Sequence, residues 1–227
     1  MYNKFIRKIC RVIPKRISNK ALINILHVLR RMNRRGRMFV YSHERSNSLV
    51  ADVSEMIEDQ STYDDVYLGM ATVAEAGCEV IAAYNVIKFI SQRTHRIIPV
   101  FSKLISFFEK DGIIFNGKFG VAPDAIEDLL KSMGYSTKRF IPGGDNYEIP
   151  SFIKEADAFI MTYYNNAEDL YEQIHTVAVT RVDNLYTAHN VYGNGYVHGP
   201  FTEVEELIKK IGIGKAGPIM YISVHDA

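Results

Sequence analysis

Cys78, His175 and Asn190 are the residues of this chain whose types and order could together perform nucleophilic chemistry. Cys78 follows an Ala76-Gly77 pair and begins a segment in which apolar residues recur at helical spacing. The first turn of a helix presents unpaired N–H groups and the positive end of the dipole, and both stabilise a thiolate. His175 begins a β-branched segment, so a rigid strand would hold its imidazole. We therefore expect a cysteine nucleophile served by a histidine base.

A predicted hairpin brings Asn190 to the same place. The dipeptide Asp183-Asn184 matches a two-residue turn between the strand-like segments 175–182 and 185–191. Pairing across this turn puts Asn190 near His175 on the neighbouring strand, where an amide would fix the tautomer and orientation of the ring. Thiol, imidazole and orienting amide are the parts of a Cys-His nucleophilic site.

Each of these residues also has an ordinary structural interpretation. A cysteine at a helix start is commonly a small buried residue, and a histidine in a strand is commonly packed and hydrogen-bonded. Asn190 could begin the turn that Val191 to Gly195 predicts. The order of the three residues and their helix-then-hairpin setting indicate a site, whereas any one of them alone does not.

The elements that would position these residues are helices first and strands later. Helices are predicted at 3–13, from Ser18 or Asn19 to Gly36, at 49–57, 79–90 and 99–110, from Pro123 to near Gly134, around Phe152 and at 202–210, and strands at 38–41, 135–141, 158–164, 175–182, 185–191 and 219–224. This order predicts an α+β fold in which N-terminal helices pack on an antiparallel sheet. The second helix has the expected apolar face Leu22, Ile23, Ile25, Leu26, Val28 and Leu29.

The charge of the chain is unevenly distributed. Residues 1–37 contain twelve Lys or Arg and no Asp or Glu, so the remainder carries a formal charge of −11. Such a basic arm could dock against the acidic remainder of its own chain, solvate a helical face, or bind an anionic membrane surface or nucleic acid. No aromatic residue interleaves with the arginines from Arg30 to Arg37, which makes nucleic acid the least favoured partner.

Composition excludes several classes of protein. The chain has 227 residues, 47% of them hydrophobic and 23% charged, which is typical of a folded globular protein. Cys10 and Cys78 are too few for a disulfide framework, and no apolar run approaches the ~20 residues of a membrane span. The Met1 end lacks a signal peptide's uninterrupted apolar region. We therefore expect a cytoplasmic location, with association to a membrane surface as an open alternative.

Metal and phosphate chemistry is not expected. His189 and His198 have no carboxylate at helical ligand spacing, so no metal site is predicted. The sequence Gly117-Lys118-Phe119-Gly120 lacks the order of a phosphate-binding loop. We expect no cofactor.

The chain resembles the papain-like cysteine peptidases. The stretch from Ala74 to Asn85, AEAGCEVIAAYN, resembles their catalytic-helix motif, most closely in the branch that trims double-glycine leaders from bacteriocin precursors. The segment from Gly120 to Tyr135 is similar to the second helix of that domain, and His175 to Val179 resembles its histidine strand. The resemblance covers roughly Gly69 to Val224, which implies a papain-like domain at 69–227 and a basic helical extension at 1–68.

The resemblance implies a cysteine peptidase that cleaves a peptide or amide bond of a peptide or protein substrate. Cys78 would be the nucleophile, His175 the general base and Asn190 the residue that orients the imidazole. The family usually carries a glutamine six residues before the cysteine as an oxyanion donor, and here that position is Thr72. Its hydroxyl is the candidate substitute, since losing one such donor typically costs ~10²–10³ in turnover.

The alternative is a papain-like module with weakened catalysis that binds a peptide or leader, at a membrane surface or in solution. Besides the missing glutamine, Glu75 and Glu79 flank the cysteine, and negative charge nearby raises the pKa of a thiol.

Overall fold

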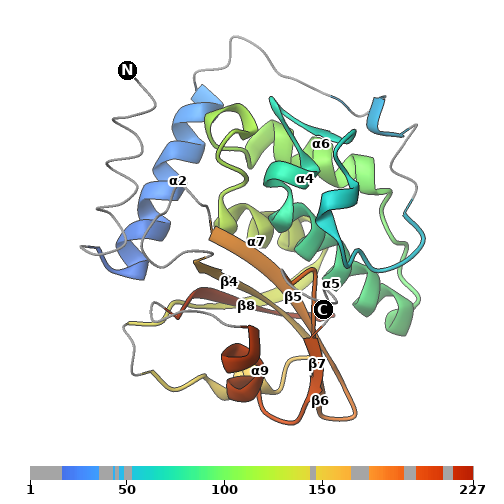
Figure 1. Ribbon diagram of the computed structural model, residues 1–227, viewed down its shortest axis with the longest axis vertical. Coiled ribbons are helices and arrows are strands. Elements are labelled where there is room, and N and C mark those ends of the chain that lie inside the picture. The colour runs from blue at the N-terminus through green and yellow to red at the C-terminus, as the bar shows by residue number, and fades with distance from the viewer. Residues whose placement is uncertain are drawn as a thin grey trace.

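The computed structural model describes residues 17–35, 43, 46–48, 53–143, 147–164, 174–191, 198–211 and 217–226. Within them, a group of helices covers one side of a six-stranded sheet, and two short helices pack on the other side (Figure 1). This architecture confirms the predicted α+β class. The helix predicted at 3–13 and the strand predicted at 38–41 lie outside the described residues.

Apart from α4, for which no helix was predicted, the longer helices follow the predicted order. They are α2 (Asn19–Arg35), α4 (Val73–Ala76), α5 (Cys78–Thr94), α6 (Phe101–Asp111), α7 (Pro123–Ser132), α8 (Ser151–Lys154) and α9 (Val204–Ile211), with 3-10 turns η1 (Gln60–Thr62) and η2 (Phe115–Gly117). Ser18 begins α2, since its hydroxyl accepts a hydrogen bond from the N–H of Ala21. Pro123 occupies the first turn of α7, where its missing N–H costs nothing.

The helix predicted at 49–57 is wrong over its described part, because residues 53–57 have no helical conformation. Side chains of α5 bond the backbone of this segment instead. Tyr84 donates to the carbonyl of Val53 at 2.8 Å, and the amide of Asn85 bonds both the N–H and the carbonyl of Ile57. Partners from a distant element therefore replace the hydrogen bonds that a local helix would have made.

The sheet is antiparallel throughout, with the order β3-β8-β4-β5-β6-β7. Its strands are β3 (Tyr135–Phe140), β4 (Ala158–Tyr164), β5 (Ile174–Val182), β6 (Leu185–His189), β7 (His198–Phe201) and β8 (Pro218–Asp226), and β1 (Tyr67–Leu68) pairs separately with β2 (Ala71–Thr72). The hairpin between β5 and β6 is confirmed: Asp183 and Asn184 have φ of 51° and 62°, as a two-residue turn requires. Strand β7 was not predicted, because Pro200 within it weakens the strand pattern.

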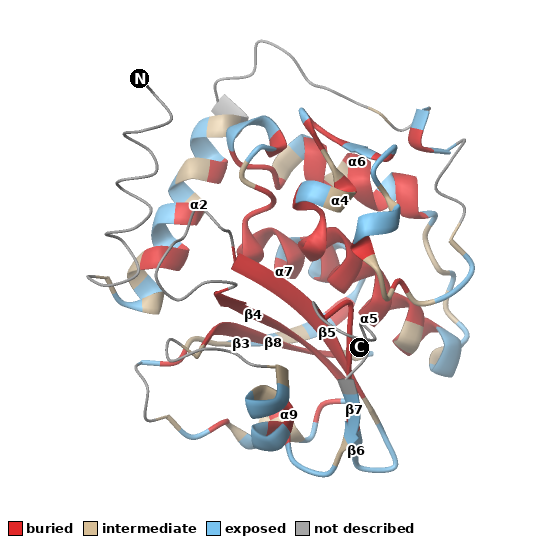
Figure 2. Cartoon of the chain, viewed as in Figure 1, coloured by how far each residue is buried: buried red, intermediate tan, exposed pale blue. Residues whose placement is uncertain are grey.

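Both faces of the central strands β4, β5 and β8 are buried, and their side chains alternate between two cores (Figure 2). On β4, Ile160 packs with the helices, whereas Phe159 and Met161 pack on the opposite face with α8 and α9. Helix α5 lies between the sheet and the other helices, and most of its residues are buried. The sheet and α5 are therefore the rigid elements on which a site can be built.

The N-terminal part shares the larger core. Leu22, Ile23 and Leu26 of α2 lie in the same hydrophobic cluster as Val80 and Ile81 of α5. The boundary predicted between residues 68 and 69 falls in the turn between β1 and β2. In the part of the chain that the structure describes, that boundary does not separate two packing units.

Arg30 ties α2 to the acidic part of the chain. Its buried guanidinium lies 3.1 Å from Asp124, 2.8 Å from Asp128 and 3.3 Å from Asp111. His27 also contacts Asp124, at 2.5 Å. The predicted docking of the basic arm on its own chain is thus observed at this position. Over the described residues, no helix is both long enough and apolar enough to cross a bilayer.

Candidate functional site

The site begins at the junction of two helices. Helix α4 ends at Gly77, and Cys78 starts α5 directly after it. A Cβ atom on Gly77 would lie 2.7 Å from the carbonyl oxygen of Val73, so only glycine allows this close approach. The junction therefore sets where the thiol sits.

The hydroxyl of Thr72 caps α4. It accepts a hydrogen bond from the N–H of Glu75 at 3.3 Å, and the carboxylate of Glu75 accepts one from the N–H of Thr72 at 3.0 Å. This reciprocal pair is a capping box, which stabilises the start of a helix. The hydroxyl of Thr72, which was predicted to be an oxyanion donor, is therefore engaged in the cap of α4.

Cys78 lies against the backbone of β5. Its Sγ is 3.9 Å from the carbonyl oxygen of Ile174, and the N–H of Thr176 also bonds the sulfur. Ile174 and Thr176 are the residues on either side of His175 in the chain. The structure therefore brings the thiol to the backbone of β5 but not to the predicted base. Because side chains alternate along a strand, Ile174 and Thr176 face Cys78, and the imidazole of His175 faces the opposite core with Tyr163.

The thiol has a second partner in Glu79, the next residue of α5. Cys78 Sγ donates to Glu79 Oε2 at 3.2 Å. The other oxygen, Oε1, accepts from the hydroxyl of Thr176 at 3.4 Å, and the N–H of Val121 also bonds this carboxylate. Glu79 is 2% exposed, and this burial raises its pKa to about 7, although the hydrogen bonds act in the opposite direction.

The surroundings of Cys78 favour the neutral thiol. Its side chain is 5% exposed, and burial followed by the negative charge of Glu79 raises its pKa well above the ordinary value. The helix N-terminus led us to expect a thiolate. Desolvation and the neighbouring carboxylate outweigh the helix dipole here, since the dipole effect is modest and a buried charge is costly.

His175 is wholly buried within β5. Its ring packs edge-to-face on Tyr163, the residue opposite it on β4, with the ring centroids 5.6 Å apart. Its Nε2 lies 2.7 Å from the carbonyl oxygen of Asn190. Because a carbonyl only accepts, Nε2 carries the hydrogen, and the lone pair of the neutral ring is on Nδ1. Burial lowers the pKa of His175 to about 4, so the ring is neutral at physiological pH.

Asn190 does lie beside His175, but through its main chain rather than its side chain. The side-chain Oδ1 accepts from the N–H of Gln60 at 3.0 Å, and Nδ2 donates to the side-chain oxygen of Gln60 at 3.3 Å. Asn190 has a φ of 59°, in the left-handed region that asparagine tolerates better than most residues. The predicted role of its amide is therefore corrected: the backbone carbonyl holds the imidazole, and the amide holds Gln60.

Gln60 and Glu58 are the residues that sequence analysis missed. The side-chain amide of Gln60 donates to the carbonyl of Ala74 at 2.8 Å, so it links the end of β6 to α4. Glu58 accepts from the N–H of Asn190 at 3.2 Å and contacts Nδ1 of His189 at 2.7 Å. Gln60 begins the segment 60–67, whose polar residues are typical of a loop, and no local signal identifies its buried role.

His189, considered above as a metal ligand, has other partners. Nδ1 of His189 contacts Glu58, and its Nε2 lies 2.8 Å from the hydroxyl of Thr180. The side chain of His198 lies outside the described residues. Among those that are described, no group of three His, Cys, Asp or Glu is arranged to hold a metal ion.

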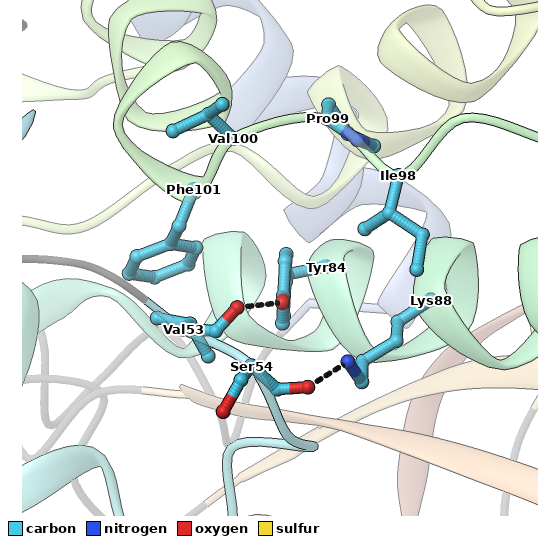
Figure 3. A pocket seen from close by; sticks show the side chains of 8 residues that line it. All are labelled: Val53, Ser54, Tyr84, Lys88, Ile98, Pro99, Val100 and Phe101. Carbon is cyan, nitrogen blue, oxygen red and sulfur yellow. Dashed lines mark hydrogen bonds between the residues drawn. The ribbon is translucent and has the colours of Figure 1, made fainter.

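A surface hollow lies farther along α5 (Figure 3). Its lining is Val53, Ser54, Tyr84, Lys88, Ile98, Pro99, Val100 and Phe101. Tyr84 and Lys88 project from α5 and bond the carbonyls of Val53 and Ser54. Tyr84 is six residues beyond Cys78, which is roughly 9 Å along a helix, and neither Cys78 nor His175 lines the hollow.

The chain matches no protein-family model, and comparisons with curated proteins and with solved structures also found no match. Any assignment of function therefore rests on the geometry of Cys78, Glu79, His175 and Asn190.

Proposed function

We propose that the protein is a papain-like cysteine hydrolase that cleaves a peptide or amide bond with Cys78 as nucleophile and His175 as base. The observation that carries this proposal is the contact of the Cys78 thiol with the backbone on both sides of His175. In the structure, the imidazole of His175 lies on the other face of β5 from the thiol, beside Tyr163, and its Nε2 is held by the carbonyl of Asn190.

The proposed reaction requires β5 to rearrange first, so that the imidazole of His175 reaches the thiol of Cys78. The Sγ–H proton of Cys78 moves to Nδ1 of His175, and the sulfur forms a bond to the carbonyl carbon of the substrate. The imidazolium then returns the proton to the leaving amine as the C–N bond breaks. Water hydrolyses the resulting acyl-thioester and regenerates the thiol. The N–H groups of the first turn of α5 are the candidate oxyanion donors, since the hydroxyl of Thr72 caps α4.

The resting site is closed and contains a neutral thiol and a neutral ring. Cys78 is 5% exposed and His175 is fully buried, so a substrate reaches the sulfur only after the site opens. Water that enters on opening would remove the desolvation that raises the thiol pKa and lowers the imidazole pKa. Opening would therefore favour the thiolate–imidazolium pair that the reaction needs.

The second candidate is a papain-like module that binds a peptide or leader without cleaving it. It is favoured by the burial of Cys78, the hydrogen bond from its thiol to Glu79 and the engagement of Thr72 in the capping box. In that case the thiol is a packed core group.

One labelling experiment separates the two candidates. The rate at which iodoacetamide alkylates Cys78 is measured by intact mass from pH 5 to pH 10, in a Cys10→Ser background that leaves one thiol. If the protein is a hydrolase, iodoacetamide labels Cys78 at pH values below the pKa of an isolated thiol, and His175→Ala removes this low-pH labelling. An ordinary thiol profile that is identical in both proteins would exclude the hydrolase and leave the binding module.

A further inference from the structure

The outward face of α2 carries an apolar stripe. Ile25, Val28 and Met32 are 39%, 53% and 62% exposed, and their spacing of three and four residues aligns them along one side of the helix. The sequence predicted Ile25 and Val28 to be core residues. Instead Leu22, Ile23 and Leu26 face the core, and the stripe faces solvent.

Basic residues lie beside this stripe. Lys20 and Arg31 are exposed on the same outward side of α2, whereas Arg30 turns inward to the aspartates of its own chain. Helix α2 contains no acidic residue, and neither does any position from 1 to 37. The helix lies at the periphery of the described fold (Figure 1), and Ile25, Val28 and Met32 on its outward face are exposed. This face thus combines the apolar side chains of Ile25, Val28 and Met32 with the cations of Lys20 and Arg31.

We propose that the outward face of α2 binds the surface of an anionic lipid bilayer. Ile25, Val28 and Met32 insert at the boundary between headgroups and acyl chains, and Lys20 and Arg31 lie at the level of the lipid phosphates. Residues 1–37 hold eleven cations besides the inward-paired Arg30, and these attract the same negatively charged surface. The proposal does not depend on the hydrolase assignment, because none of these residues belongs to the Cys78 site.

The chemistry of the face distinguishes this partner from two others. A nucleic-acid backbone would use the cations but would leave the apolar stripe in water, and α2 has no aromatic side chain on which bases could stack. A second copy of the chain would cover the stripe but would bring two strongly basic segments together, which like-charge repulsion opposes. A bilayer with anionic lipids satisfies both halves of the face.

The test is co-sedimentation of the full chain with vesicles of phosphatidylcholine alone or with 30% phosphatidylglycerol. We expect binding to the anionic vesicles that weakens steeply between 50 and 500 mM NaCl. Lys20→Gln with Arg31→Gln lowers the partition coefficient at low salt about 25-fold, since each cation near such a surface contributes roughly fivefold. The triple variant Ile25→Ser, Val28→Ser, Met32→Ser lowers it by at least about tenfold, because all three apolar groups leave the lipid. Ile97→Ser is the matched control, because Ile97 is 92% exposed and lies outside α2.

Each other outcome overturns the proposal. Binding that the serine triple variant leaves unchanged, or equal binding to neutral vesicles, excludes the α2 face as an anionic-lipid site. Binding to duplex nucleic acid but not to vesicles identifies the face as a phosphate-backbone site instead. A dimer in light scattering that the triple variant converts to a monomer identifies a second copy as the occupant. Circular dichroism confirms folding of the variants, all of which are at exposed positions.

Discussion

The thiol of Cys78 donates a hydrogen bond to the carboxylate of Glu79, the next residue in the chain, at 3.2 Å inside the protein core. The pair sits in the first turn of α5 and is buried against β5. A carboxylate in this position stabilises the proton on sulfur, because it accepts the S–H and repels the negative charge of a thiolate. Glu79 therefore opposes the helix N-terminus, which would favour the thiolate.

Glu79→Gln is expected to raise the reactivity of Cys78. The amide keeps the shape and a hydrogen-bond acceptor but removes the charge, so the pKa of the thiol falls and the thiolate fraction at pH 7 to 8 increases. A fall of one pKa unit gives about tenfold faster alkylation. The measurement is the iodoacetamide rate in the Cys10→Ser background. Glu75→Gln is the control, because Glu75 is exposed and glutamine preserves a capping box. Slower alkylation of Glu79→Gln would instead make Glu79 the group that accepts the thiol proton.

The stability of the fold is expected to depend on pH through two buried groups with opposite signs. The pKa of Glu79 is raised from 4.5 to about 7, so between these values the folded state holds a proton that the unfolded state has lost. Stability from this group falls as pH rises. The pKa of His175 is lowered from 6.5 to about 4, so between these values the unfolded state binds a proton that the folded state does not. Stability from this group rises with pH.

Single substitutions separate these two contributions, each of which is on the order of 3 kcal/mol in the free energy of unfolding. In Glu79→Gln the His175 effect remains, and stability increases from pH 4 to 6.5. In His175→Gln the Glu79 effect remains, and stability decreases from pH 4.5 to 7. In the unsubstituted protein the two slopes largely offset each other between pH 4.5 and 6.5. Urea unfolding at a series of pH values measures all three profiles, and parallel profiles would contradict the assignment.

Asn190 is expected to matter for stability more than for the ionisation of His175. Asn190→Gly keeps the carbonyl that bonds the imidazole and tolerates the φ of 59°, but it removes both hydrogen bonds to Gln60. Because this leaves buried groups of Gln60 unsatisfied, we expect a loss of about 2 kcal/mol in urea unfolding.

Asn190→Ala provides the comparison for that prediction. Alanine lacks the same amide and also disfavours positive φ, so we expect a further loss of about 1 kcal/mol. In both variants the pH dependence of Cys78 alkylation should match that of the parent. An altered pH dependence in Asn190→Gly would show that the side chain, rather than the carbonyl, governs the ring.

The parts of the fold that the sequence predicted are those with local causes. The Asp183-Asn184 turn fixes the hairpin of β5 and β6 through its own backbone preference. The run 158–164 is apolar or aromatic except for Thr162 and predicts a strand, which is β4. The start of α5 at Cys78 follows from Gly77 before it and helical spacing after it.

The parts that could not be predicted depend on distant partners. Residues 53–57 are not helical, and Tyr84 and Asn85 of α5 bond their backbone instead. The six apolar residues of α2 cover so much of the circumference of the helix that the sequence does not show which side faces the core. In the observed rotation, Arg30 points inward to Asp124 and Asp128, and Ile25 and Val28 face outward. No local pattern contains those partners.

Gly77→Ala is expected to destabilise the protein and displace Cys78. The added methyl group would lie 2.6 Å from Val73 Cγ1 and 2.7 Å from its carbonyl oxygen, so α4 and α5 must move apart. Overpacking of this kind typically costs about 2 kcal/mol in the free energy of unfolding. Since the movement withdraws the thiol from β5, it should also speed alkylation of Cys78. Gly143→Ala is the matched control, because nothing lies within 4 Å of its added methyl group, and we expect a change within roughly 0.5 kcal/mol. Equal stability of the two variants in urea unfolding would mean that the α4–α5 junction accommodates the methyl group with no loss in the free energy of unfolding. In that case the junction does not hold the thiol in place.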